Sequence, residues 1–310
     1  SNWEKFVRTS LDQGIRIFLS GSSSKLLSRE IATSMRGRNL TYAILPFSFK
    51  EYLKCYHLYP KEYISSSEKS KMLNLLRKYS EYGGYPEAVL YEKENQNILS
   101  EIKETTIYKD IIEREKIRNT KVLKLLINAL INSKEFSTNK FYNFLKSTGM
   151  KVGKNVLYHY VECLSDVFFV FLVRKFSYSY KKAEQSIPKV YFVDNGLLTM
   201  SGVDDKGRLM ENLVFVELRR RGLDISYYQA LKEEVDFVIK EKRKIKQLIQ
   251  VCYNIENFNT KEREIKGLLK ASKELKCNNL LVITDNSEGE EKIKGKKIKF
   301  ISLWKWLLEK

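Results

Sequence analysis

The stretch "EVDFVIKEKRKIKQLIQVC", residues 234–252, decides the fold of the C-terminal part of the chain. Its two apolar runs have the length of buried strands, and a lysine-rich turn separates them. A third run, "ISYY", precedes them, and helices are predicted on either side, over Leu209–Arg221 and Lys261–Lys276. The strands "NLLVIT" and "KFISL" and a closing helix, "WKWLLE", complete the order. The sequence therefore predicts a small mixed sheet flanked by helices over residues 195–310.

The same region carries acidic residues in a chemically meaningful order. One large class of nucleases has a glutamate on a helix, an acidic residue on one strand and Glu-x-Lys on the next strand. In these enzymes the carboxylates hold Mg²⁺ and the lysine orients the attacking water. The candidates are Glu211 or Glu217 on the helix and Asp236 on the strand. The third position reads "QVC", where Gln250 supplies no carboxylate charge and Cys252 no cation. We expect a nuclease-like fold without nuclease activity and without a metal; the alternative is that the acidic residues form weak surface ion pairs.

Three helices and two strands are predicted between residues 119 and 194. The helices span Thr120–Asn132, Thr138–Ser147 and Gly153–Asp166, and the strands Phe168–Val173 and Lys189–Val193 follow. Three helices with a tight second turn, followed by a β-hairpin, form the layout of a winged helix-turn-helix. Winged helices bind DNA but also serve as protein–protein modules, so both interpretations stay open.

The charge of the chain indicates a polyanionic partner. The net charge is +18, which suits nucleic acid or an acidic membrane surface. Basic residues gather around the connection between the two strands of the predicted winged helix, where they suit phosphate contact. The candidates for nucleic-acid binding are Lys154, Arg174, Lys175, Lys181 and Lys182. The alternative is that a lysine-rich composition makes the whole chain basic indiscriminately.

Cysteines and apolar runs indicate the compartment. The four cysteines are scattered without a Cys-x-x-Cys pair, and the chain has two histidines, so we expect reduced thiols in a cytoplasm and no structural zinc site. No apolar run approaches the roughly 20 residues that span a bilayer. We therefore expect a cytoplasmic protein with no membrane partner.

The N-terminal stretch "LSGSSSKLLSREIATSMRGR", residues 19–38, raises the question of a phosphate-binding loop. It follows an apolar run over residues 15–20 that reads as a buried strand, and a helix is predicted over Ser28–Met35. A P-loop needs a second glycine directly before its lysine, and none stands between Gly21 and Lys25. The 310-residue sequence contains no Walker A motif, so the stretch needs another explanation.

Taken together, these motifs resemble those of archaeal and bacterial AAA-type ATPases with a C-terminal DUF4143 region. The N-terminal stretch and "YAILPFSFKEYL" are similar to the second half of the ATPase core. "GGYPEAV", "YKDIIER", "KVYFVDNGLL", "ENLVFVELRRRG", "EVDFVI" and "IQVCYN" follow in the order of the family. The resemblance implies an α/β protein, α+β overall: a partial P-loop ATPase core over residues 1–55, a helical connecting segment over 56–118, a winged helix over 119–194 and a restriction-endonuclease-like PD-(D/E)XK domain with a mixed sheet over 195–310.

The resemblance also assigns roles to residues of the N-terminal stretch. In this family "LSGSSS" ends the strand that places a polar sensor residue beside the γ-phosphate, which points to Ser20 or Ser22. Arg36 or Arg38 matches the arginine finger that reaches a neighbouring nucleotide. The Walker A lysine and Walker B acidic pair would lie upstream of Trp3, so the chain resembles an N-terminally truncated member. The intact family uses ATP and Mg²⁺; in this chain we expect no cofactor and no ATP turnover.

Three hypotheses for function follow. The leading one is the C-terminal part of an AAA-type ATPase that binds DNA or a protein partner without hydrolysing ATP or cutting DNA. The second is an active metal-dependent DNA endonuclease in which Glu211, Glu217, Asp236 and Gln250 hold the metal. The third is a non-enzymatic interaction protein whose basic surface is incidental. Assembly into an oligomer is compatible with all three.

Overall fold

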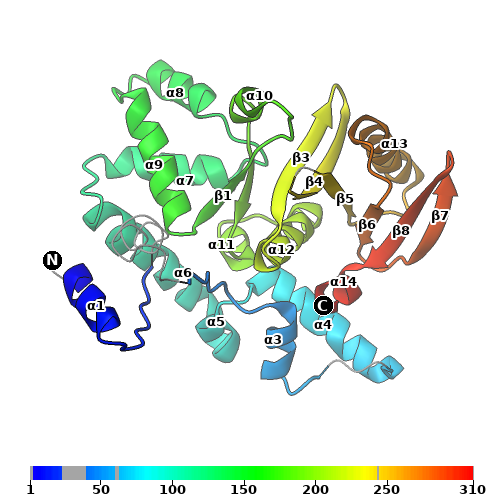
Figure 1. Cartoon of the computed structure of the whole chain (residues 1–310), viewed down its shortest axis with the longest axis horizontal. Helices are drawn as coiled ribbons and strands as arrows, with labels where there is room; N and C mark the ends of the chain where they lie inside the picture. The colour runs from blue at the N-terminus through cyan, green and yellow to red at the C-terminus, as the bar shows by residue number, and fades with distance from the viewer. Residues whose placement is uncertain (1–2, 23–39, 60–62, 243, 310) are drawn as a thin grey trace.

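The computed structural model describes residues 3–22, 40–59, 63–242 and 244–309 (Figure 1). The chain is a mixed α/β protein, as the sequence predicts, and it contains a two-stranded and a six-stranded sheet. Within the described residues, no helix combines the length and the apolar character needed to cross a bilayer.

The described N-terminal residues consist of α1 (Trp3–Asp12) and an irregular segment that follows it. The strand predicted over residues 15–20 is wrong: the segment has no regular structure and the side chain of Phe18 is 94% exposed. A buried strand needs a neighbour that accepts and donates its backbone hydrogen bonds. The strands that the structure describes all pair elsewhere, in the two sheets further along the chain. The helix predicted over Ser28–Met35 lies outside the described residues.

A run of helices connects this segment to the rest of the molecule. In chain order they are α3 (Phe49–Cys55), α4 (Ser66–Tyr82), α5 (Pro86–Leu90), η2 (Glu92–Glu94), α6 (Asn95–Thr105) and the π-helix η3 (Thr106–Glu113). Capping boxes fix two of the starts, Ser48 with Glu51 for α3 and Ser65 with Glu68 for α4. The turn predicted in "YGGYPEAV" is confirmed, because Gly83 caps the end of α4 with φ +78° and α5 begins at Pro86.

A buried aspartate ties this helical segment to the middle of the chain. Asp194 Oδ2 accepts a hydrogen bond from the Gly84 N–H at 2.7 Å, and Oδ1 accepts one from the Gly196 N–H at 2.8 Å. The second bond caps α11 (Asn195–Thr199). Burial raises the pKa of Asp194 to about 6, although both backbone donors stabilise its charged form. One carboxylate therefore holds together backbone segments 110 residues apart.

The middle of the chain follows the predicted order of three helices and two strands. These are α7 (Thr120–Ile131), α8 (Thr138–Ser147), α9 (Lys154–Asp166), β1 (Val170–Val173) and β2 (Lys189–Phe192). The strands pair antiparallel and pack with the helices around one apolar core. Their connection contains a short helix that the sequence analysis missed, α10 (Tyr180–Glu184), capped by Ser179.

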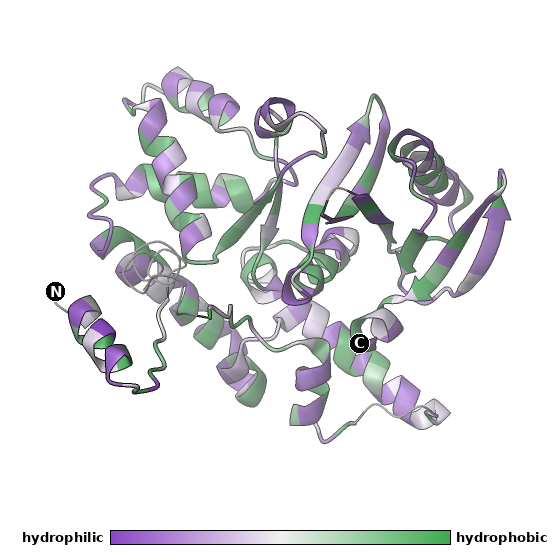
Figure 2. Ribbon diagram, in the orientation of Figure 1, coloured by the Kyte–Doolittle hydropathy of each residue, from purple (hydrophilic) through white to green (hydrophobic). Residues whose placement is uncertain are grey.

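The C-terminal part contains the predicted mixed sheet. Its strands are β3 (Asp224–Ala230), β4 (Glu233–Glu241), β5 (Lys244–Cys252), β6 (Leu280–Thr284), β7 (Gly289–Ile293) and β8 (Lys296–Ser302), in the order β3-β4-β5-β6-β8-β7. β5, β6 and β8 are parallel and the other pairs are antiparallel. β7 was missed because its sequence, "GEEKI", is polar; in Figure 2 it is mostly purple, whereas β6 is green.

Helices cover both faces of this sheet. Leu213 and Val214 of α12 (Lys206–Arg220) pack in the same core as Ile249, whereas Leu268 of α13 (Phe258–Leu275) packs in a second core with Leu248. Because neighbouring strand residues point to opposite faces, α12 and α13 lie on opposite sides of β5. The helix α14 (Leu303–Leu308) closes the chain and adds two buried tryptophans to the α12 side.

Candidate functional site

A lysine from β2 lies among the carboxylates of the C-terminal domain. The Lys189 Nζ is 2.8 Å from Asp236 Oδ1 on β4 and 3.0 Å from Glu211 Oε1 on α12, and it also forms an ion pair with Glu234. The lysine side chain is 6% exposed. We call these four residues the lysine–carboxylate cluster. It places one cation from β2 against three carboxylates, one from α12 and two from β4.

Backbone pairing fixes the lysine in this position. Lys189 begins β2 directly after Pro188, whose carbonyl accepts a hydrogen bond from the Phe136 N–H. The ammonium also lies 5.8 Å from the centre of the Tyr227 ring, and the Tyr227 hydroxyl donates to the Ile187 carbonyl at 2.7 Å. The backbone on the N-terminal side of Lys189 and the ring beside its ammonium are therefore both fixed by other parts of the fold.

Two side chains attach α12 to β2 beside the cluster. The Tyr191 hydroxyl donates to Glu211 Oε1 at 2.6 Å, the same oxygen that accepts from Lys189. The Asn212 side chain accepts from the Phe192 N–H at 2.8 Å and donates to the Phe192 carbonyl at 3.0 Å. The Asn212 amide thus supplies the hydrogen bonds that a third strand would otherwise make to the backbone of Phe192 at the edge of the two-stranded sheet. They set Glu211 at a fixed distance from β2.

Asp236 and Gln250 are joined through the backbone of β4 and β5. Asp236 Oδ2 accepts from the Val251 N–H at 3.0 Å, and Gln250 Oε1 accepts from the Asp236 N–H at 3.2 Å. The Gln250 amide also donates to Glu264 Oε2 of α13 at 2.6 Å. A glutamate at position 250 could not make this last bond while ionised, because it has no donor. A glutamine therefore suits position 250, because its amide can donate a hydrogen bond to the neighbouring carboxylate of Glu264.

The charges in the cluster shift its pKa values in opposite directions. Although burial alone would lower the Lys189 pKa, the charges of Asp236 and Glu211 raise it well above its usual value, so the ammonium stays protonated. Burial would raise the pKa of Glu211, but Lys189 and the Tyr191 hydroxyl lower it below its ordinary value. Burial and the charge of Glu211 raise the pKa of Asp236 to about 7. The charge of the Lys189 ammonium thus outweighs the effect of burial on the pKa of Glu211 but not on the pKa of Asp236.

The sequence comparisons match this architecture. An AAA domain model matches residues 1–53, a domain of unknown function, DUF8612, matches residues 73–207, and a domain of unknown function, DUF4143, matches residues 206–306. An uncharacterized protein from Methanocaldococcus jannaschii is 45% identical over 322 residues, which cover 99% of this chain and 72% of that protein. The chain belongs to this family of AAA-domain proteins with a C-terminal DUF4143 region. An uncharacterized protein from Haemophilus influenzae is 28% identical, over 99% of this chain and 74% of its own length.

Of the nuclease-like candidates, the structure brings three together. Glu211, Asp236 and Gln250 all lie in or beside the lysine–carboxylate cluster. Glu217 does not, because its carboxylate pairs with Arg220 at 3.3 Å and Arg221 at 2.9 Å on its own helix. Glu217 therefore stabilises the C-terminal end of α12 and is unavailable to a shared site.

Cys252 is buried at the end of β5, in the apolar core beneath α13. Burial and the nearby charge of Glu264 raise the pKa of its thiol to about 11. At neutral pH the thiol is therefore uncharged, and it offers neither the cation of a Glu-x-Lys strand nor a thiolate.

Sequence reasoning missed Lys189 and Glu234. Lys189 belongs to a different predicted domain, and a lysine at the start of an apolar strand reads as a solvent-facing end. The available signal was that "KVYFV" places a charge on a strand whose remaining residues are apolar. Glu234 precedes Asp236 by two residues, so both side chains point to the same face of β4. That alternation was visible in "EVD".

The family-derived ATPase residues divide between described and undescribed parts of the chain. Ser20 is exposed in the irregular segment, and Ser22 is exposed as well. The Ser22 hydroxyl donates to Asp110 Oδ1 of η3 at 2.6 Å. Arg36 and Arg38 lie outside the described residues, so their roles stay a prediction.

The basic candidates differ in their availability. Lys154, at the first position of α9, is exposed, and so are Lys181 and Lys182 on α10. Arg174 instead donates to the Ser186 carbonyl at 3.0 Å and lies 3.6 Å from Glu184. Lys175 is half-buried, where its backbone bridges to β3 of the large sheet. Three of the five predicted phosphate contacts therefore present exposed side chains, and the other two help to fix the connection between β1 and β2.

Proposed function

We propose that this chain is a part of an AAA-type ATPase that binds duplex DNA without cutting it and does not hydrolyse ATP by itself. The observation that carries the absence of DNA cleavage is the position of Lys189, whose ammonium contacts three carboxylates of the C-terminal domain at once. A nuclease would use these carboxylates to hold Mg²⁺ against the scissile phosphate. Here a cation of the protein itself already neutralises them.

The residues of the cluster do not fit a Mg²⁺ ion. Mg²⁺ requires close to octahedral coordination by oxygen atoms. Among the described residues, Glu211, Glu234 and Asp236 do not bring their oxygens together within 4.8 Å of one another, and Gln250 contributes an amide that is bonded to Glu264. An entering ion would have to displace a buried ammonium from its hydrogen bonds. These features support a structural cluster that fastens β2 to the large sheet.

The wing between β1 and β2 is the surface best suited to DNA. Its sequence "SYSYKK" alternates aromatic and small residues before two lysines, and the side chains of Tyr178 and Tyr180 are 79% and 80% exposed. Lys181 and Lys182 follow on α10 and are exposed. In Figure 1, α10 and α8 lie along the same upper edge of the molecule. Exposed lysines contact phosphates, and exposed tyrosines supply flat faces for sugar and base contacts.

The test is the salt dependence of DNA binding by fluorescence anisotropy. We expect weak binding with little sequence preference, and a binding constant that falls steeply as salt rises, because lysine–phosphate contacts release counterions. The Lys181→Ala/Lys182→Ala variant should weaken binding and flatten the slope of log K against log salt by about 2.

The matched control is Lys292→Ala/Lys294→Ala, which removes the same charge from two exposed lysines around the β7–β8 turn. This control should keep the wild-type slope to within about 0.5. Equal losses in both double variants would mean that only net charge matters, and would contradict a specific role for the wing.

One observation favours the alternative of a metal-dependent endonuclease. In the nuclease class that the sequence resembles, a lysine near the metal-holding carboxylates orients the attacking water, and Lys189 lies 2.8 Å from Asp236. In that case Lys189 would be catalytic rather than structural, and its replacement by methionine would abolish an existing cleavage activity. DNA cleavage by the unmodified chain therefore separates the two functions.

A further inference from the structure

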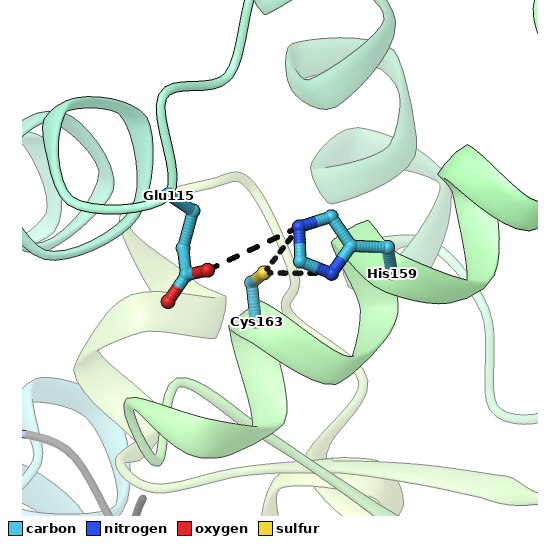
Figure 3. A group of neighbouring side chains, drawn as sticks. All are labelled: Glu115, His159 and Cys163. Carbon is cyan, nitrogen blue, oxygen red and sulfur yellow. Dashed lines mark hydrogen bonds and ion pairs between the residues drawn. The ribbon is translucent and has the colours of Figure 1, made fainter. Parts of the chain in front are cut away.

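Three side chains with metal-binding atoms, none of them part of the lysine–carboxylate cluster, converge just after the end of η3 (Figure 3). The ligand atoms of Glu115, His159 and Cys163 all lie within 4.8 Å of one another. The Cys163 Sγ is 3.7 Å from His159 Nδ1 and 3.6 Å from Nε2. The His159 Nε2 is 4.0 Å from Glu115 Oε2.

Local structure fixes all three positions. His159 and Cys163 are four residues apart on α9, so they lie on one face of the helix. Glu115 follows η3, where Lys116 adopts φ +53° and turns the chain toward α7. Ile117, after this turn, is buried in the same apolar core as Cys163. The group is therefore assembled by the packing of the core and requires no rearrangement of the backbone.

We propose that Glu115, His159 and Cys163 form a Zn²⁺ site with a fourth position open to water. A thiolate, an imidazole and a carboxylate are the donors that Zn²⁺ takes in proteins, whereas Mg²⁺ and Ca²⁺ prefer oxygen alone. Zn–S and Zn–N bonds of about 2.3 and about 2.0 Å in a tetrahedral site place sulfur and nitrogen about 3.5 Å apart. The Cys163 Sγ is at a similar distance, 3.6 Å, from His159 Nε2. It also lies 3.7 Å from Nδ1, so metal binding requires the exposed imidazole to rotate until one nitrogen is directed at the ion.

Charge and exposure agree with this assignment. The thiolate and the carboxylate together cancel the charge of Zn²⁺, so a site with a buried sulfur carries no net charge. The His159 side chain is 44% exposed, which leaves room for water at the fourth position. The other oxygen of Glu115, Oε1, lies 3.6 Å from Arg114 Nε. Arg114 would therefore orient the carboxylate while Oε2 remains directed at the metal.

The expectation of no zinc site rests on scattered cysteines without a Cys-x-x-Cys pair and on a count of only two histidines. The proposed site instead combines a histidine and a cysteine one helical turn apart with a glutamate 44 residues before the histidine. Bound Zn²⁺ would connect the turn after η3 to α9 and restrain the helix that carries the exposed Lys154. Because the ion binds the folded state, it should raise the stability of the chain in proportion to the logarithm of its free concentration.

The test uses the full chain with any histidine tag removed. Calorimetric titration with ZnCl₂ should give one ion per chain, and CoCl₂ should give the thiolate-to-cobalt absorption that marks a cysteine ligand. His159→Gln, Glu115→Gln and Cys163→Ala should each weaken zinc binding by at least about tenfold, and Cys163→Ala should abolish the cobalt–thiolate absorption. Zinc should also raise the melting temperature of the wild type but not of the variants.

The controls are His57→Gln, which removes the other histidine, and Cys277→Ala, which removes another buried cysteine. Both should bind zinc as the wild type does. His159→Gln alters an exposed side chain and keeps the test decisive should Cys163→Ala fail to fold. Failure of the wild type to bind one ion, or wild-type affinity in His159→Gln, would overturn the proposal. DNA binding does not enter the readout, so this result stands apart from that of the proposed function.

Discussion

The Lys189 ammonium lies 2.8 Å from the carboxylate of Asp236, although the two residues belong to different sheets and are 47 positions apart in the chain. This pair joins the β1–β2 unit to the six-stranded sheet. Under the proposed function, it also places a protein cation where a nuclease of the class that the sequence resembles would need a metal. The expected consequences concern stability as much as catalysis.

Lys189→Met should destabilise the chain by about 3–5 kcal/mol, because it leaves buried carboxylates without a compensating cation. Urea unfolding at neutral pH measures this loss. The matched control is Lys297→Met, whose ion pair with Glu290 at 2.6 Å is exposed and should contribute less than about 1 kcal/mol. Adding Glu211→Gln and Asp236→Asn to Lys189→Met should restore part of the stability. Equal effects of Lys189→Met and Lys297→Met would show that the buried cluster has no special energetic role.

Gln250→Glu should also destabilise the chain, and more so as pH rises. The new carboxylate would face Glu264 without the donor that now bonds it at 2.6 Å. Repulsion and burial should raise the pKa of the new group in the folded state, so its cost is small at about pH 4 and grows to about 1–3 kcal/mol as pH rises through that pKa. Gln247→Glu is the control, because Gln247 bonds the neutral Asn279. A loss of stability independent of pH would contradict this explanation.

Two glycines with the same backbone angle separate backbone strain from close contact. Gly83 and Gly149 both have φ +78°, but a Cβ on Gly83 would lie 1.7 Å from Asp194 Oδ1, whereas one on Gly149 would meet nothing within 4 Å. Gly149→Ala should therefore cost about 1 kcal/mol, and Gly83→Ala several times more. Thermal unfolding of the two variants compares them. Equal losses would mean that Asp194 does not pack against the turn as described.

Asp194 should make stability depend on pH in a defined direction. Its pKa is raised to about 6 in the folded state, above the unfolded value of about 3.9. A group with a raised folded pKa contributes stability that is full below the unfolded pKa and is lost as pH rises through the folded pKa. The difference in unfolding free energy between wild type and Asp194→Asn should therefore shrink from about pH 4 to about pH 7. A difference that grows over this range would contradict the raised pKa.

The C-terminal sheet was predictable because its strands are continuous apolar runs bounded by turns. β6 is buried along its whole length and all but one of its residues are apolar, and β5 is buried mainly in its second half, where its apolar run lies. β7 is an edge strand that pairs only with β8, and its largely exposed sequence, "GEEKI", gives no apolar signal. The run over residues 15–20 gave a strong signal without a strand, because pairing depends on a partner that local sequence does not reveal.

The candidate site was predictable only within its own domain. Asp236 and Gln250 lie opposite each other on adjacent strands, and their positions in the two predicted strands were enough to group them in one candidate site. Lys189 reaches them through tertiary packing of a separate unit, which no local pattern encodes. The proposed zinc ligands have no local signal for the same reason, since Glu115 meets His159 only after η3 and α9 have packed.

The most direct measurement is incubation of the unmodified chain with supercoiled, linear and branched DNA in the presence of Mg²⁺ or Mn²⁺. The account predicts binding without nicking or cleavage. Lys189 is paired with the carboxylates of Glu211 and Asp236, and Gln250 and Cys252 replace the glutamate and the lysine of the Glu-x-Lys pattern with uncharged side chains. Asp236→Ala should leave DNA affinity nearly unchanged, since Asp236 is buried. Metal-dependent cleavage by the unmodified chain that disappears in Asp236→Ala would contradict the account and identify the protein as an endonuclease.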